Sequence, residues 1–185
     1  MLRSMMLLSL LMLLGACQAT GPRADYDLSR DFSQYQTWSW ADPPVTYAPA
    51  NDPRLASDLT SQRVLEAVAG QLDVRGLRPA QQADAADLKV RASLVLETRR
   101  DNITTHYGGG WGYWGPYWGG PGYSQTRTVD YQVMTLQIDM LDASDGRLVW
   151  RGSDSQTVDA RQTPLERTQE MHERAAQVLS TFPPN

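Results

Sequence analysis

Several residue types are scarce in this chain of 185 residues, and each shortage removes a class of structure or chemistry. Cys17 is the single cysteine, so no internal disulfide can form. Lys89 is the single lysine, and the formal net charge is −4. We therefore expect no nucleic-acid partner, because phosphate contacts need a positive face. The two histidines, His106 and His172, lack the spacing of a metal site, and we expect both to be solvated.

Sequence motifs of catalysis are missing as well. The chain contains no Gly-x-Ser-x-Gly motif and no phosphate-cradling glycine motif. Asp139, Asp142 and Asp145 precede Gly146 but lack the ligand spacing of a calcium loop, so we expect Asp142 and Asp145 to shape a turn. We expect no metal, no cofactor and no enzymatic activity. Paired carboxylates for glycoside hydrolysis stay open, because their separation depends on the folded structure.

The N-terminus has the layout of a secretory signal peptide. Arg3 precedes an apolar run at residues 5–14, which Ser9 alone interrupts. As a helix this run would be about 15 Å long, half of a hydrocarbon core of roughly 30 Å, so it is too short to span a membrane. An ordinary secretory signal followed by an incidental cysteine is one interpretation.

The run ends in Leu14-Gly15-Ala16-Cys17, which resembles the lipobox of bacterial lipoproteins. That resemblance implies cleavage before Cys17 and acylation of the cysteine with chains such as palmitate. Several acyl chains make a permanent anchor. Gln18 stands where an aspartate would imply retention in the inner membrane, so the outer membrane is the expected location.

These signals divide the chain into three parts. Residues 1–16 are the expected signal peptide, residues 17–23 the lipidated cysteine and a polar tether, and residues 24–185 a single periplasmic domain. The last part has the usual size of one domain.

Apolar periodicity predicts the secondary structure of that domain. Helices are expected at 58–75, capped by Ser57 or Asp58, and after Thr163, where Pro164 and Glu166 complete a capping box. Strands are expected near 24–28, 35–40, 88–96, 126–141 and 147–152, with a proline-rich loop at 42–53. The predicted fold is α+β, a mainly antiparallel sheet of about five strands with two helices packed on one face.

Two finer predictions concern this sheet. Apolar residues shift from odd to even positions near Val133 and Met134, which predicts a bulge there. Trp38, Trp40 and Trp150 share faces with other apolar residues, so we expect them in the core.

Residues 107–123 form a separate segment made only of Gly, Trp, Tyr and Pro. Because so much glycine makes ordering costly, a hairpin tip or insertion is expected. The candidate binding residues in it are Trp111, Tyr113, Trp114, Tyr117 and Trp118, whose rings suit sugars, a lipid interface or a partner's groove. A low-complexity loop without a specific role is the other interpretation.

With these segments in place, the chain resembles the bacterial lipoprotein family known as domain of unknown function 4136. Five segments carry the resemblance in order: Asp25-Tyr26-Asp27, residues 31–40, Asp87-Leu88-Lys89-Val90, Leu148-Val149-Trp150-Arg151-Gly152 and Phe182-Pro183-Pro184. The resemblance implies a lipid-anchored domain that faces the periplasm, and it supplies no catalytic residues.

Three functions are open. The leading hypothesis is a non-enzymatic lipoprotein, attached to the membrane through lipid on Cys17, that binds or scaffolds another envelope protein or peptidoglycan. The alternative is a cell-wall glycan hydrolase or glycan-binding module that uses the aromatic loop. The third is a stress or biogenesis accessory with transient partners.

Overall fold

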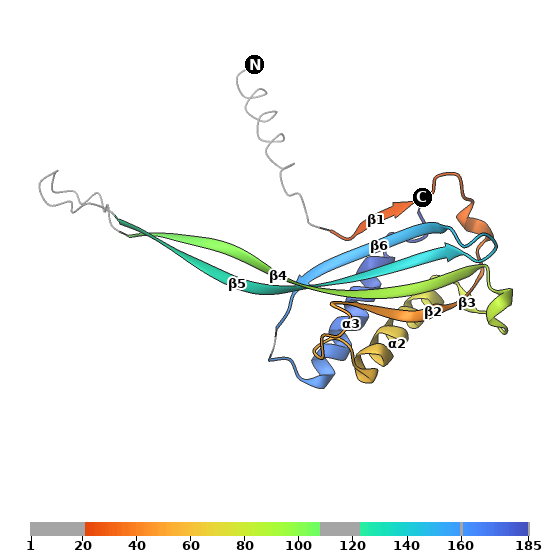
Figure 1. Cartoon of the computed structure of the whole chain (residues 1–185). Helices are drawn as coiled ribbons and strands as arrows, with labels where there is room; N and C mark the ends of the chain where they lie inside the picture. The colour runs from red at the N-terminus through yellow and green to blue at the C-terminus, as the bar shows by residue number, and fades with distance from the viewer. Residues whose placement is uncertain (1–20, 108–122, 160, 185) are drawn as a thin grey trace, which may run out of the picture.

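The computed structural model describes residues 21–107, 123–159 and 161–184. These residues form one mixed sheet with two helices on a single face, and two of the strands run far beyond the rest (Figure 1). No helix among the described residues is long and apolar enough to cross a membrane. The α+β prediction is confirmed, with six strands where about five were expected.

The sheet has the order β1-β6-β5-β4-β2-β3. Its strands are β1 (Arg23–Tyr26), β2 (Thr37–Ala48), β3 (Arg78–Pro79), β4 (Leu88–Tyr107), β5 (Tyr123–Asp142) and β6 (Leu148–Thr157). The pairs β1–β6, β6–β5 and β5–β4 are antiparallel, whereas β2 runs parallel to both β4 and β3. Short 3₁₀ turns, η2 (Phe32–Gln34) and η3 (Ala83–Ala85), lie in the connections.

Both helices begin where the sequence predicts. Helix α2 (Asp58–Val74) is capped by Ser57, whose hydroxyl accepts from the Thr60 amide at 3.2 Å. Helix α3 (Pro164–Leu179) has the full capping box, because Thr163 Oγ1 accepts from the Glu166 amide at 3.3 Å and Glu166 Oε2 accepts from the Thr163 amide at 2.7 Å. These bonds satisfy amides that the helices themselves leave unpaired.

The core lies between the helices and one face of the sheet. Alternate residues of β4 from Leu88 to Leu94 are fully buried and meet Leu136, Ile138 and Met140 of β5. Trp38 and Trp150 are buried, which confirms that they belong to the core, and Trp40 is partly buried and packs against it. In the part of the chain that the structure describes, the buried core cluster lies between positions 38 and 182.

The long hairpin of β4 and β5 leaves the body of the domain as a two-stranded arm (Figure 1). Strand β2 stops pairing at Val95 and β6 stops at Val133, whereas β4 and β5 remain paired from Thr98↔Gln132 to Tyr107↔Tyr123. We call residues 98–107 and 123–132 the arm. At about 3.3 Å per residue, its ten pairs extend roughly 33 Å.

The two faces of the arm differ. On the continuation of the helix-covered face, cross-strand polar pairs bond to each other: Arg100 Nε to Asp130 at 3.0 Å, Thr128 to Asn102 at 2.9 Å and Thr104 to Thr126 at 2.9 Å. The opposite face carries the apolar side chains of Ile103, Val129 and Tyr131.

This change of face corrects the predicted bulge. The register between β4 and β5 is continuous through Val133 and Met134, and the irregularity in β5 lies between Met140 and Leu141. The odd-numbered apolar residues simply occupy the face opposite the helices. A strand that outruns its helical cover can change its apolar face without any break in the pleat.

The predicted loop at 42–53 is wrong in its first half. Residues 45–48 pair with β4, and only residues 41–44 are displaced, where the register between β2 and β4 shifts. Pro43 and Pro44 fall in this irregular stretch, which is where a strand tolerates proline.

Candidate binding cavity at the base of the arm

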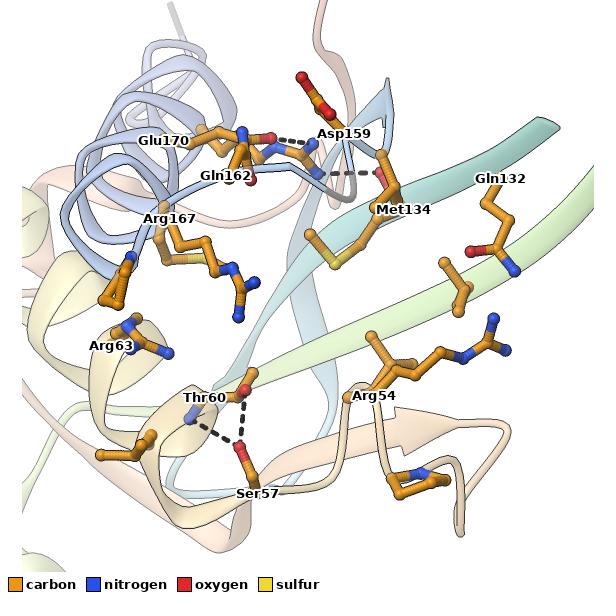
Figure 2. A pocket seen from close by; sticks show the side chains of 18 residues that line it. Arg54, Ser57, Thr60, Arg63, Gln132, Met134, Asp159, Gln162, Arg167 and Glu170 are labelled. Carbon is orange, nitrogen blue, oxygen red and sulfur yellow. Dashed lines mark hydrogen bonds and ion pairs between the residues drawn. The ribbon is translucent and has the colours of Figure 1, made fainter.

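A cavity of about 530 Å³ opens where the arm meets the body of the domain. It lies between the N-terminal halves of α2 and α3 and the adjoining parts of β4 and β5 (Figure 2). Its lining combines apolar and charged side chains: Pro53, Arg54, Leu55, Ser57, Leu59, Thr60, Arg63, Leu96, Gln132, Met134, Val158, Asp159, Gln162, Pro164, Arg167, Glu170, Met171 and Arg174.

Four arginines line this cavity, and their partners differ. Arg54 is held by Asp52, with Nε to Oδ1 at 2.9 Å and Nη2 to Oδ2 at 2.5 Å. Arg63 donates from Nε to Thr168 Oγ1 at 3.2 Å. Among the described residues, neither Arg63 nor Arg167 has a carboxylate within 4.0 Å. Arg167 extends from α3 into the space between the helices and the strands (Figure 2).

The fourth arginine, Arg174, is the deepest, with 1% of its surface exposed. Its Nη1 donates to the Met134 carbonyl at 3.0 Å, and its Nη2 is ion-paired with Glu170. Its Nε has no hydrogen-bond partner among the described residues. A buried guanidinium N–H without an acceptor is unfavourable.

The cavity has two acidic residues. Glu170 is engaged by Arg174 and also accepts from Gln162. Asp159 accepts from the Arg161 amide at 2.9 Å. With Arg63 and Arg167 unmatched by these contacts, the site favours a negatively charged group.

A second polar cluster lies at the opposite end of the sheet, beside the turn between β5 and β6. Arg30 reaches from the segment after β1 to Asp142 at 2.9 Å and Asp145 at 2.5 Å, and the Tyr35 hydroxyl donates to Asp142 at 2.9 Å. Burial, and then the bond to the Asp142 carboxylate, raises the pKa of Tyr35 to about 12. Hydrogen bonds from Ser144 lower the pKa of Asp142 below its usual value.

This cluster confirms that Asp142 and Asp145 shape a turn. Asp142 accepts from the Ser144 amide at 2.8 Å, and Asp145 accepts from the Arg147 amide at 2.9 Å. Asp139 is occupied elsewhere, because Arg151 binds both of its oxygens at 2.7 Å. Within residues 21–107, 123–159 and 161–184, no group of three or more His, Cys, Asp or Glu side chains is placed to hold a metal ion.

The remaining residues singled out from the sequence fall into two groups. Cys17 and the loop residues Trp111, Tyr113, Trp114, Tyr117 and Trp118 lie outside the described residues. His106 on the arm and His172 on α3 are exposed, as expected.

Sequence reasoning missed the arginines of the cavity. Arg174 could have been noticed, since it lies three residues after Met171 and therefore on the apolar stripe of α3. Arg63 and Arg167 have no such local signal, because only the packing of α2 against α3 brings them to one cavity.

The fold defines a class of protein, an α+β domain with two helices over one face of the sheet and a long hairpin that extends beyond it. The chain belongs to the family described as domain of unknown function DUF4136, whose model matches residues 22–184. The family resemblance seen in the sequence is thereby confirmed. No curated protein matches the chain.

Two solved structures are similar in fold. A DUF4136 family protein from Bacteroides thetaiotaomicron has 17% sequence identity and a TM-score of 0.51, and the match covers 88% of this chain and 95% of that one. A PDZ domain protein from Parabacteroides distasonis has 11% identity and a TM-score of 0.53, and the match covers 89% of this chain but 36% of that one. At such identities the likeness concerns the fold alone.

Proposed function

We propose that this chain is a lipid-anchored lipoprotein of the bacterial outer membrane whose domain faces the periplasm and is a non-enzymatic binding module. The observation that carries the binding role is the arginine-lined cavity at the base of the arm. The proposal of a lipid anchor is based on the Leu14-Gly15-Ala16-Cys17 pattern and on the short sequence separation between Cys17 and β1, which begins at Arg23. Such a tether spans at most about 20 Å, so lipid on Cys17 would keep the β1 edge near the membrane.

The acids of the cavity favour binding over hydrolysis. A glycoside hydrolase needs two carboxyl groups that act on one bond. Glu170 is already paired with Arg174 and bonded to Gln162, which leaves Asp159 as the one other acid that lines this cavity in the described part of the chain. The unmatched cations Arg63 and Arg167 instead suit recognition of an anion.

The anchor is tested by a Cys17→Ser variant expressed in bacteria. We expect the unaltered chain to take up labelled palmitate and to sediment with outer membranes, and the variant to do neither. A variant that sediments and matures in size as the unaltered chain does would contradict the anchor.

The binding role is tested by photo-crosslinking in intact cells from two positions on α2. Leu59 lines the cavity and is 63% exposed, whereas Val74, at the far end of the same helix, is 77% exposed and lies outside it. A photoreactive amino acid at position 59 should give a defined adduct that the same group at position 74 does not. Equal labelling from both positions, or none from either, would contradict a binding role for the cavity.

Glycan binding or hydrolysis through the aromatic loop is the second candidate. Pairing of Tyr107 with Tyr123 brings both ends of that loop to the far end of the arm, away from the helices. We expect the unlipidated domain to sediment with peptidoglycan only when residues 108–122 are present, and release of soluble sugar would favour the hydrolase. Equal sedimentation with and without these residues would exclude a glycan role for Trp111, Trp114 and Trp118.

A further inference from the structure

We propose that the cavity binds an acidic amphiphile, a molecule whose carboxylate or phosphate group meets Arg63 and Arg167 and whose aliphatic part covers the leucines and methionines of the wall. This inference rests on the binding function proposed above and names its ligand class. Three features of the cavity support it: two arginines without a carboxylate partner among the described residues, two helix N-termini and several apolar side chains.

The charge comes from two different helices. Arg63 projects from α2 and Arg167 from α3, and both line the cavity. The contacts of the described residues give neither guanidinium a carboxylate partner, whereas Arg54 is held by Asp52 and Arg174 by Glu170. Guanidinium groups bind carboxylates and phosphates through paired, charge-assisted hydrogen bonds. An acidic group between the helices would therefore satisfy both side chains.

Two further sources of positive potential reach the same place. The N-terminal ends of α2 and α3 both border the cavity, at Ser57 and at Pro164, and helix N-termini favour anions. Arg174 also lines the cavity, but it is 1% exposed and its charge is paired with Glu170.

The rest of the wall is apolar. Leu59, Leu96, Met134 and Met171 line the cavity, and Leu59 is 63% exposed although it lies on a helix that packs against the core. A bare anion such as phosphate would leave these side chains in water, whereas an aliphatic chain would remove their apolar surface from water, which is favourable. Methionine adapts its shape to flexible apolar ligands. The combination favours a ligand with one acidic end and one aliphatic end.

The methionines make this ligand class measurable. After Cys17 the chain contains Met134 and Met171, which line the cavity, and Met140, which is fully buried in the core. The unlipidated chain from Gln18 onward, labelled with ¹³C at the methionine methyl groups, therefore reports on the cavity at two positions and on the fold at a third. It should be titrated separately with decanoate, decyl phosphate, decanol and inorganic phosphate, each below micelle-forming concentrations.

We expect decanoate or decyl phosphate to shift the Met134 and Met171 signals saturably while Met140 stays in place. Whichever of the two binds more tightly identifies the acidic group as a free acid or a phosphate headgroup. Decanol and inorganic phosphate should bind at least about tenfold more weakly, because each supplies only half of the recognition.

Arginine variants separate the charge from the fold. The double variant R63Q/R167Q should weaken binding of the acidic amphiphile about tenfold or more and leave decanol unchanged. R78Q is the matched control, since Arg78 is a surface arginine paired with Asp73, outside the cavity. An unmoved Met140 signal in each variant shows that the core is intact.

Three results would overturn the proposal. If decanol bound as tightly as decanoate, the site would recognise only the aliphatic chain. If inorganic phosphate alone saturated the site, it would recognise only the anion. No shift with any of the four probes would exclude this ligand class. The binding function would survive that last result if position 59 still gave its own crosslinked adduct in cells, so the two failures are distinguishable.

Discussion

The indole ring of Trp150 occupies the space where Gly152 would carry a Cβ atom. These residues lie two apart on β6, on the helix-covered face, and a Cβ built on Gly152 would lie 2.8 Å from Trp150 Cζ2 and 2.9 Å from Val178 Cγ1. Gly152 is itself buried, and the absence of a Cβ atom there leaves room for the Trp150 ring.

A Gly152→Ala variant should therefore lose roughly 1–3 kcal/mol of unfolding free energy, because even one added methyl group overpacks this part of the core. Urea denaturation measures the loss. Gly70→Ala is the matched control, since nothing lies within 4 Å of a Cβ at this helical position. That variant should gain roughly 0.5–1 kcal/mol. Equal effects at the two sites would show that Trp150 does not need the space.

Alkaline pH should destabilise the domain through Tyr35. Its pKa is 10.0 in the absence of structure and about 12 in the fold, so the folded state favours the neutral phenol. The stability it contributes is complete below pH 10, falls between pH 10 and 12, and is absent above that range. Urea midpoints measured from pH 9 to 12 should therefore fall less steeply in Tyr35→Phe than in the unaltered chain.

Tyr47→Phe serves as the control for this experiment, because it removes the hydroxyl of a different tyrosine, one bonded to Ser61 at 2.6 Å. Parallel pH profiles for both tyrosine variants would contradict the role assigned to Tyr35.

At acid pH the sign of the effect is reversed for Asp142. The folded pKa of Asp142 lies below the usual 3.8, so its contribution to stability is present above pH 3.8 and is lost as the pH falls through the folded value.

The arm should be dispensable for folding. Replacing residues 102–128 with Asn-Gly joins Asp101 to Val129, which face each other in the hairpin, through a two-residue turn. Because the described residues within this segment pair only with each other, we expect the unfolding free energy to change by less than about 0.5 kcal/mol.

Leu94→Ala, in the helix-covered part of the same strand, gives the scale for that comparison. Leu94 is fully buried, and its truncation should cost about 2–5 kcal/mol. If shortening the arm cost as much as this substitution, the arm would have to be counted as part of the core.

Secondary-structure elements that are determined by residues close together in the sequence could be predicted from the sequence. The capping box of Thr163 and Glu166 and the cap at Ser57 depend on residues three positions apart, and both helices begin where these signals indicate. The alternation from Leu88 onward likewise identifies β4, because one face of it is buried by helices.

Features that depend on distant neighbours could not be predicted in the same way. Strand β2 continues after Pro44 because β4 supplies a partner for Val45, which the proline-rich sequence does not reveal. The shift of apolar residues at Val133 has its cause in where the helices end. The cavity joins Arg63 and Arg167, which are far apart in sequence and meet only through the packing of α2 on α3.

The polar pairs along one face of the arm have a mechanical consequence. Arg100, Asn102 and Thr104 form hydrogen bonds with their cross-strand partners. This face of the arm therefore presents no apolar surface in its described residues that would favour packing of the arm against α2 and α3. Leu96 and Met134, in the wall of the cavity, lie on the same two strands as the arm. We therefore expect a force applied to the far end of the arm to act on the cavity wall through β4 and β5.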